Sequence, residues 1–582
     1  MGLKRRDEKQ MRRELYLVLL VTLAALAVRL YGIDFGLPYV YNRDEAVIVD
    51  LAVGFGSGDL NPHFFAYPTL YMYALFGFYG AYFVLGWLFG LISSVYDFAL
   101  LFFRDPTLFY LTGRLVAATL GTATVPLVYC LGRKVYSTRV GLVAALFLAF
   151  APLHVEFSHY VKTYAPMTFV ATLGLLAAWL AYEHGGLKRY LLAGTLAGTA
   201  ASVMYQGGFV LFALLAAHIL RVSGTMGKRV QAILADRNLI LSVIACGLAF
   251  VVGTPFVVLD WKGFVNDLSG AAAFFASSPT GNSEWLFVPL SLMDTMTWPL
   301  GAVALAGFSY ALWRRRPGDV ILATFPLTMT AFLTVLARKE VHTVVPMFPP
   351  LLLMGAVFLV AASDHLIRKP AWRPAVLVTL AVTVVAYPAF VSVRLSYTLA
   401  QADTRTKGLA WVLANVPAGT KIIIDSGQYY VSGMNVPLQD CPENLQRRAE
   451  ESRKLPEQEK TRREGMRQRF SGAADFFQYQ LAAQTGPTYC LIRILHNPST
   501  PDIEVRALEE YLADGAQYAV VNVSVYRWYA VRRETDRFFP EKARAYRAFY
   551  ASLEQNATLL VEFVGGTIGH PGPTIRVYHL HR

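Results

Sequence analysis

The sequence predicts an α-helical polytopic membrane protein with about eleven spans plus interfacial helices, followed by a C-terminal α/β domain. Composition is the first reason: 55% of the 582 residues are hydrophobic and only 16% are charged, whereas soluble proteins carry about 25% charged residues. The second is that uncharged apolar windows such as 239–258 and 375–393 are long enough to cross a bilayer. The third is a change to soluble character from about residue 400.

The N-terminal segment is basic and leads directly into the first span. An apolar run starts near Leu15 and contains Arg29, and six basic residues precede it: Lys4, Arg5, Arg6, Lys9, Arg12 and Arg13. A secretory signal peptide also starts with basic residues, but a small-residue cleavage site does not follow here. We therefore expect an uncleaved first span at 14–31 and a cytoplasmic N-terminus.

Ten further apolar segments are expected to span the membrane: 111–131, 138–154, 166–183, 190–203, 208–221, 238–258, 286–313, 319–336, 343–362 and 374–393. The apolar stretch 69–103 decides the topology. A single crossing there would turn the basic loops Arg133-Lys134 and Arg314-Arg315-Arg316 outward, against the positive-inside rule. We therefore expect 69–103 to form interfacial helices or a re-entrant hairpin inside a long external loop, 32–110.

This topology divides the chain into a membrane-embedded domain, 1–398, and a soluble extracytoplasmic domain, 399–582. Much of the net charge of +13 lies in short cytoplasmic loops, so it indicates orientation in a cell membrane and not a nucleic-acid partner. Cys441 and Cys490 lie in the polar C-terminal part, where a disulfide between them is one open alternative. The sequence has no Cys or His spacing typical of a metal site.

The C-terminal domain is predicted to contain both helices and strands. A helix is expected at 404–415, and a charged, helix-prone stretch runs from 443 to 469. Strands are expected at 421–425, 518–523 and 574–580. This mixture is the basis for the α/β assignment.

Two adjacent carboxylates, Asp44 and Glu45, follow the first span by about a dozen residues. Carboxylates at a membrane surface are costly to desolvate, so they mark a functional site unless water solvates them. In a site they would act as a general base on an acceptor hydroxyl or help to bind a divalent cation. A solvated pair of loop acids is the alternative.

The loop after the 138–154 segment, 152–166, collects an acid, two histidines and a lysine between two spans. Lys162 is suited to hold a phosphate at the bilayer surface, and Glu156 to position an acceptor or a metal. His154 and His159 rank below them, because a lone histidine is more often a structural residue.

Two further external loops carry polar residues. Arg338, Lys339 and His342 occupy a short turn on the face where basic residues are disfavoured, which points to a lipid phosphate; headgroup snorkelling is the alternative. The loop 259–285, with Asp260, Trp261, Asp267 and Glu284, is long enough to serve as a lid. The aromatic run from His63 to Leu70 suits anchoring at the membrane interface.

The order of these motifs resembles the GT-C glycosyltransferase superfamily, in particular its protein O-mannosyltransferase and aminoarabinose-transferase group. The acidic pair is the most specific of them, and the others are Ala66-Tyr67-Pro68-Thr69-Leu70, Gly113-Arg114-Leu115, Gly132-Arg133, 152–169 and 338–350. The resemblance implies transfer of one hexosyl or pentosyl sugar from a polyprenyl phosphate to a protein or lipid/glycan hydroxyl on the outer face of the membrane, with inversion.

The resemblance also implies a role for each candidate residue. Asp44 would be the catalytic base, with Glu45 as its neighbour. The donor phosphate would be bound by four cations or donors: Lys162, Arg338, Lys339 and His342. Glu156, His159 and Tyr164 would position the acceptor or a metal. No cofactor is assigned, and a divalent cation such as Mg²⁺ or Mn²⁺ stays open.

The sequence departs from the pattern of that group at two places. Tyr164 stands where many relatives have an aspartate before the Pro-Met-Thr-Phe segment, which leaves Glu156 as the nearest acid. His342-Thr343 stands where relatives often have Arg-Tyr.

A polytopic transporter of a lipid-linked or small polar substrate is the main alternative function. However, the polar residues concentrate at one membrane face and no inverted repeat is visible. An assembly protein that recruits a partner through its C-terminal domain is a second alternative. Neutralising Asp44 would abolish turnover in an enzyme only.

Overall fold

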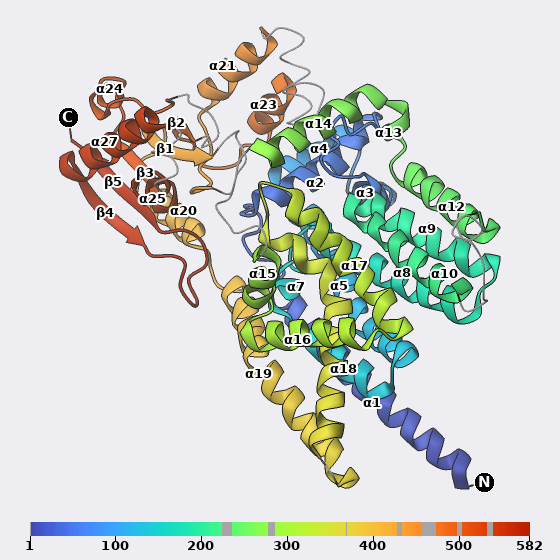
Figure 1. Ribbon diagram of the computed structural model, residues 1–582. Coiled ribbons are helices and arrows are strands. Elements are labelled where there is room, and N and C mark those ends of the chain that lie inside the picture. The colour runs from blue at the N-terminus through green and yellow to red at the C-terminus, as the bar shows by residue number, and fades with distance from the viewer. Residues whose placement is uncertain are drawn as a thin grey trace. The chain divides into compact units, whose positions relative to one another are not determined.

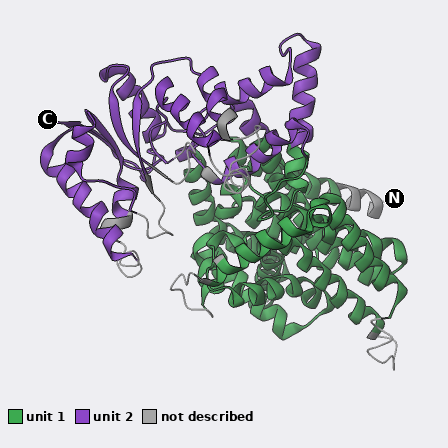
Figure 2. Cartoon of the chain, turned by 90° about the horizontal axis from the view of Figure 1, so that it is seen from above, with its two compact units in different colours: residues 1–31, 60–75, 113–396 green, residues 32–59, 76–112, 397–582 purple. Residues whose placement is uncertain are grey.

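The computed structural model describes residues 2–223, 235–277, 286–367, 369–427, 434–454, 473–496, 503–531 and 539–581. The chain divides into two compact units, coloured in Figure 2. Unit 1 consists of 1–31, 60–75 and 113–396, and unit 2 of 32–59, 76–112 and 397–582. Each unit has a hydrophobic core of its own.

Unit 1 is helical throughout its described part (Figure 1). Its helices, including three that continue into unit 2, are α1 (Gly2–Leu30), α3 (Leu70–Leu88), α5 (Thr107–Val135), α6 (Thr138–Ala149), α7 (Pro152–Glu156), α8 (Tyr164–His184), α9 (Leu187–Val203), η2 (Tyr205–Phe209), α10 (Val210–Ser223), α12 (Arg237–Gly253), α13 (Phe256–Leu259), α14 (Trp261–Ser277), α15 (Phe287–Thr295), α16 (Trp298–Arg314), α17 (Pro317–Val335), η3 (Val341–Met347), α18 (Phe348–Leu366), η4 (Pro370–Trp372) and α19 (Arg373–Leu399). Among the described residues, seven helices are long and apolar enough to cross a membrane.

Two predicted spans are broken in the structure. The segment 138–154 ends as a helix at Ala149, because Pro152 restricts the residue before it and starts the short helix α7. The segment 286–313 forms two helices, α15 and α16, instead of one. The break lies at Thr297, whose φ of +70° cannot continue a helix.

The ambiguous stretch 69–103 forms two helices, α3 and α4 (Val95–Arg104). Gly90, with a φ of +69°, lies in the turn between them. Because α3 is one of the seven helices long enough to cross, the expectation that 69–103 does not cross stays a prediction.

Unit 2 contains the predicted α/β domain. Its elements are α2 (Arg43–Gly54), η1 (Phe55–Ser57), α4, α20 (Thr404–Asn415), β1 (Lys421–Gly427), α21 (Pro442–Arg453), α23 (Ala473–Ala482), β2 (Cys490–His496), α24 (Leu508–Ala513), β3 (Tyr518–Asn522), α25 (Val523–Val531), α27 (Pro540–Asn556), β4 (Ala557–Phe563) and β5 (Ile575–Leu580). The strands form one sheet in the order β2-β1-β3-β5-β4, in which β1 is parallel to β2 and β3 while β5 is antiparallel to β3 and β4.

Helices cover both faces of this sheet (Figure 1). Ile423 and Val521 pack on the face covered by α24, α25 and α27. Their strand neighbours Ile422 and Val520 pack on the opposite face, against α20. This alternation follows from the two-residue period of a strand, and it explains why central strands β1 and β3 are apolar on both sides.

The Cys441–Cys490 disulfide is present, joining the residue before α21 to the first residue of β2. The helix predicted at 404–415 is α20, and the strands predicted at 421–425, 518–523 and 574–580 correspond to β1, β3 and β5. The charged stretch 443–469 begins as α21, but its part from 455 onward lies outside the described residues.

Candidate active site

Arg29, the charged residue inside the first predicted span, forms hydrogen bonds with the loop 152–166 and with the end of the preceding helix. Arg29 is fully buried, and all five of its N–H donors have acceptors. These acceptors are the carbonyls of Ala25, Leu148 and Ala149, the hydroxyl of Ser158 and Nδ1 of His154, at 3.0 to 3.3 Å. A buried charge of this kind requires such full pairing, so Arg29 fixes where α6 ends and α7 begins.

The contact between Arg29 and His154 also determines which ring nitrogen of the histidine carries the proton. A guanidinium only donates, so Nδ1 of His154 accepts at 3.0 Å and the ring proton is on Nε2. Ser158 donates its hydroxyl proton to the His154 carbonyl at 2.7 Å. Gly121 on α5 leaves room for this arrangement, because a Cβ there would lie 2.3 Å from the Ser158 Oγ.

His159, a predicted positioning residue, is completely buried. Its Nδ1 lies 2.9 Å from the Val155 carbonyl and its Nε2 3.2 Å from the Tyr31 carbonyl. Both carbonyl oxygens can only accept, and a neutral imidazole has a single N–H. A neutral His159 therefore donates to one of the two carbonyls only. Burial lowers the pKa of His159, although the two carbonyls oppose this shift. Its surroundings suit a residue that shapes the loop.

Glu156 and Lys162 are neighbours in the same loop. Burial raises the pKa of the Glu156 carboxyl, and the Lys162 ammonium and the Tyr160 hydroxyl partly counteract this effect. The Lys162 side chain is only 7% exposed, and its Nζ lies 5.7 Å from the centre of the Phe157 ring. A carboxylate and a cation are thus kept in a largely dry setting, where electrostatic interactions are stronger than in water.

The structure brings His342 to this loop. Its ring centre lies 4.9 Å from that of Tyr164 and 5.5 Å from that of Phe157, in tilted or edge-on geometry. The contact arises because η3, which carries His342, packs against both α7 and α8. Residues about 180 positions apart in the chain thereby form one cluster.

Arg338 and Lys339 precede η3 and differ in their surroundings. Arg338 Nε donates to Glu340 at 3.0 Å, and both side chains are about one-third exposed. Lys339 is 5% exposed, and its Nζ lies 6.0 Å from the Phe287 ring centre. Lys339 is thus a largely buried cation beside an aromatic ring, which keeps it a candidate for binding an anion.

The predicted lid and the predicted anchor are bonded to each other within unit 1. The segment 259–277 forms the end of α13 and α14, and Glu284 lies outside the described residues. Asn61 donates to Asp260 at 2.9 Å, and the Phe65 N–H donates to Asp267 at 2.8 Å. Any motion of α14 as a lid would have to carry the Asn61–Phe65 segment with it or break these bonds.

Asp44 and Glu45 lie in unit 2, in the first turn of α2. Asn42 caps this helix by accepting a hydrogen bond from the Asp44 N–H at 3.1 Å. Acidic residues are favourable in a first turn, because they face the positive end of the helix dipole. Asp44 is exposed whereas Glu45 is completely buried. The two carboxylates therefore differ in access to solvent, and Asp44 is the accessible one.

A third carboxylate of α2, Asp50, was not predicted. Burial raises its pKa to about 7, although a hydrogen bond from the Tyr110 hydroxyl at 3.2 Å lowers it. The same hydroxyl is within electrostatic range of Glu45. A carboxylate within the otherwise apolar stretch 46–54 of this helix was the signal that could have identified Asp50 from the sequence.

The segment before α2 is attached to α20 inside unit 2. The Arg405 guanidinium lies 3.8 Å from the Tyr41 ring centre and is held by Asp403 through two hydrogen bonds of 2.7 and 2.8 Å. The Tyr41 hydroxyl is 2.7 Å from the Thr406 Oγ1. The loop that carries the acidic pair is thus part of the folded C-terminal unit.

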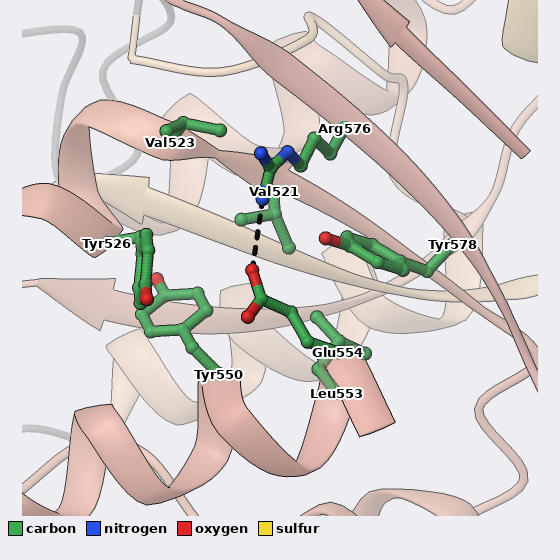
Figure 3. Close-up of a pocket in the computed structure, with 8 residues that line it drawn as sticks. All are labelled: Val521, Val523, Tyr526, Tyr550, Leu553, Glu554, Arg576 and Tyr578. Carbon is green, nitrogen blue, oxygen red and sulfur yellow. Dashed lines mark hydrogen bonds and ion pairs between the residues drawn. The ribbon is translucent and has the colours of Figure 1, made fainter. Parts of the chain in front are cut away.

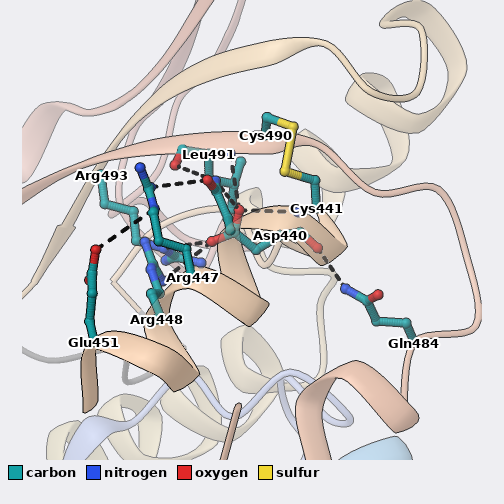
Figure 4. A network of polar contacts seen from close by, with 10 residues as sticks. Asp440, Cys441, Arg447, Arg448, Glu451, Gln484, Cys490, Leu491 and Arg493 are labelled. Atoms are coloured by element: carbon teal, nitrogen blue, oxygen red, sulfur yellow. Dashed lines mark hydrogen bonds and ion pairs between the residues drawn. A yellow bond between two sulfur atoms is a disulfide. The ribbon is translucent and has the colours of Figure 1, made fainter. Parts of the chain in front are cut away.

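Asp440 is the centre of a polar network in the C-terminal domain (Figure 4). One carboxylate oxygen accepts from the N–H groups of Cys441 and Leu491, both at 3.1 Å. The other oxygen lies 3.3 Å from Arg448 and 3.7 Å from Arg493. The network joins α21 to β2 beside the disulfide, which is a structural role.

A small pocket lies between the sheet and helices α25 and α27 (Figure 3). It is lined by Val521, Val523, Tyr526, Tyr550, Leu553, Glu554, Arg576 and Tyr578. Arg576 donates to Glu554 across it at 3.0 Å. None of the predicted site residues lies in this pocket.

Few donor groups of the described residues lie close enough together to share a cation. Among the described residues, one group of three candidate ligands is close enough to share a metal: Cys441, Glu443 and Cys490. Its two sulfurs are joined as a disulfide and are not thiolates. At Glu156 the neighbouring Lys162 ammonium would repel a cation. The expected divalent cation at Asp44 and Glu45 stays a prediction.

Residues 110–258 match the family model described as dolichyl-phosphate-mannose-protein mannosyltransferase. This range contains the whole loop 152–166. No curated protein sequence matches the chain.

Solved structures match the chain over different lengths. The apo oligosaccharyltransferase of Archaeoglobus fulgidus superposes with a TM-score of 0.51 and 11% identity over 92% of this chain and 72% of that chain. ArnT of Cupriavidus metallidurans bound to undecaprenyl phosphate superposes with a TM-score of 0.49 and 14% identity, and the match covers 97% of each chain. The Pmt1–Pmt2 protein O-mannosyltransferase complex of S. cerevisiae bound to the sugar donor superposes with a TM-score of 0.33 and 20% identity. This match covers 49% of this chain and 37% of that chain.

The chain therefore shares the fold of the Archaeoglobus fulgidus oligosaccharyltransferase, and part of it matches a mannosyltransferase family model, in line with the resemblance seen in the sequence. It is a multi-pass membrane protein.

Proposed function

We propose that this protein is a membrane glycosyltransferase that moves one sugar from a polyprenyl-phosphate donor to a hydroxyl group of a protein or of a lipid or glycan. One observation carries the proposal: within the range that matches the mannosyltransferase family model, Glu156 and Lys162 lie in a dry loop beside Tyr164, and His342 packs against this loop. The description of that family names dolichyl-phosphate-mannose, which is a lipid-phosphate-linked sugar.

The proposed reaction is a single displacement with inversion at the anomeric carbon. Asp44 takes the proton from the acceptor hydroxyl, whose oxygen forms the new bond to that carbon. The bond from the anomeric carbon to the phosphate oxygen breaks, and its electron pair stays on the phosphate. The leaving group thereby gains negative charge, which Lys162 and Lys339 stabilise.

The remaining candidates have supporting parts in this proposal. Glu156, Tyr164 and His342 shape the sugar and phosphate sites, while Arg338 is a weaker candidate because Glu340 already pairs with it. His159 is a structural residue, since backbone carbonyls face both of its ring nitrogens. Glu45, being buried, positions the first turn of α2.

We also propose that the N-terminus is cytoplasmic and that the C-terminal domain is extracytoplasmic. The basic N-terminal segment supports this orientation through the positive-inside rule. The Cys441–Cys490 disulfide supports it independently, because stable disulfides form in oxidising compartments. The reaction would then take place on the outer face.

The decisive experiment compares wild type with Asp44→Asn for transfer of labelled sugar from polyprenyl-phosphate donors in purified membranes. Loss of a general base should lower the transfer rate about 100- to 10,000-fold. Asp59→Asn is the matched control, since Asp59 is another exposed acid of the same loop. Equal activity of Asp44→Asn and wild type would remove Asp44 from the mechanism. Movement of donor across sealed vesicles without a new glycosidic bond would favour the transporter.

A further inference from the structure

Thr163, at the start of α8, has a buried hydroxyl without a hydrogen-bond partner among the described residues. The residue is 1% exposed and occupies the N-cap position, but its side chain makes no capping hydrogen bond. Other N-cap side chains, such as Ser137 and Asp403, bond to the backbone of their helices. A buried hydroxyl without a partner is costly, so it needs an explanation.

The other buried threonines of α8 show what is usual in this helix. Thr168 donates to the Tyr164 carbonyl at 2.7 Å, and Thr172 donates to the Thr168 carbonyl at 2.6 Å. Both hydroxyls are therefore satisfied by the preceding turn. Thr163 lies one residue before the helix, and its hydroxyl makes no such bond among the described residues.

The backbone at the same helix end offers a further donor. The Met167 N–H is bonded to the Thr163 carbonyl at 2.8 Å, and Pro166 has no N–H. Among the described residues the N–H of buried Ala165 has no acceptor. An α-helix of 21 residues also has a positive partial charge at this end, which favours an anion.

The charged side chains at this helix end suit an anion as well. Lys162 directly precedes Thr163 and is almost fully buried. Glu156 is the opposing charge, but burial raises the pKa of its carboxyl, so it gives up its charge more readily than an exposed acid. The end of a membrane-spanning helix is also at the level where lipid phosphates lie.

We propose that the N-terminus of α8 is a phosphate-binding site in which the Thr163 hydroxyl, the Ala165 N–H and the Lys162 ammonium bind the phosphate oxygens. The proposal rests on the proposed function, because the polyprenyl-phosphate donor and product supply such a phosphate. A phospholipid headgroup presents the same chemistry. Thr163 is then a binding residue that holds the leaving group during transfer, a role that the sequence motifs did not assign.

The test is equilibrium binding of undecaprenyl phosphate to the purified full-length protein in detergent. Thr163→Val keeps the side-chain shape but removes the hydroxyl, and the loss of one hydrogen bond to a charged group should raise Kd about 10-fold. Thr163→Ser retains the hydroxyl and should stay within about 2-fold of wild type. Thr168→Val is the matched control, since it removes a buried hydroxyl of the same helix that already has a partner.

If Thr163→Val does not fold, Thr163→Ala removes the same hydroxyl with less bulk. The proposal would be overturned if Thr163→Val or Thr163→Ala bound undecaprenyl phosphate with the same Kd as wild type. It would also be overturned if wild type did not bind undecaprenyl phosphate. Equal competition by phosphatidylglycerol would retain the phosphate site but assign it to a headgroup. Binding that depends on Thr163 without any sugar transfer by wild type would support the site and contradict the proposed function.

Discussion

Replacing Arg29 with methionine should destabilise unit 1 strongly, because one side chain satisfies buried groups from three parts of the chain. Methionine has a similar length but no donors, so all five hydrogen bonds disappear. Two of the acceptors, the Ala149 carbonyl and Nδ1 of His154, have no other donor among the described residues. The loss is therefore concentrated on these two groups.

The size of the effect follows from these two acceptors. A buried polar group left without a partner costs about 1–3 kcal/mol, which gives about 2–6 kcal/mol for the pair. Removal of a buried charge offsets part of this cost. We expect a net loss of about 3 kcal/mol in unfolding free energy. Arg29→Lys should be intermediate, since an ammonium has three donors on a single atom.

The assay is reversible unfolding of the purified protein by titration with SDS in mixed micelles, followed by tryptophan fluorescence. Arg394→Met is the matched control, because Arg394 is an exposed arginine of another membrane helix, α19. Its unfolding free energy should change by less than about 0.5 kcal/mol. If Arg29→Met and Arg394→Met unfold alike, Arg29 does not hold the loop 152–166 and the argument is refuted.

Three further predictions concern other sites. Cys441→Ser together with Cys490→Ser opens a loop of 49 residues and should destabilise the C-terminal domain by about 4 kcal/mol in the chain-entropy model. The free energy of unfolding is measured with and without reductant, and no change on reduction of wild type would contradict this prediction. Burial raises the pKa of Asp425 to about 7 in the folded protein, so its stabilising effect is complete below about pH 4 and is lost as the pH rises through 7. Asp425→Asn should flatten this pH dependence in hydrogen exchange of β1 and β3, and an unchanged slope would exclude Asp425 as its source. Gly121→Ala should cost about 1–3 kcal/mol, because the new Cβ would lie 2.3 Å from the Ser158 Oγ, whereas Gly247→Ala, with open space around it, should be neutral in the same SDS titration.

Local patterns in the sequence were sufficient for much of the fold. The helix α20 has the predicted bounds because Asp403 caps it and apolar residues recur at helical spacing. Strands β1 and β3 were recognisable from their apolar runs. The break at Thr297 was not, because a change of a single φ angle leaves the hydrophobic character of 286–313 unaffected.

Contacts between distant residues explain what the sequence could not provide. Arg29 was noted as a charge inside a span, but its partners Ala149 and Ser158 are 120 and 129 positions away. The meeting of His342 with Tyr164 was expected only from the shared membrane face. Thr163 escaped notice because the signal is a missing hydrogen bond, which only coordinates can reveal.

Unit 2 is assembled from segments that are far apart in the sequence, and this has a consequence for biosynthesis. Tyr41, three residues before Asp44, contacts Thr406 and Arg405, which are made 365 and 364 residues later. At translation rates of about 5–20 residues per second, these partners emerge roughly 20 to 70 s after Tyr41. During this interval the membrane helices between them are inserted while the acidic pair still lacks its α20 support. The segment that carries Asp44, the proposed catalytic base, would therefore gain its contacts with α20 only after the membrane helices between them have been made.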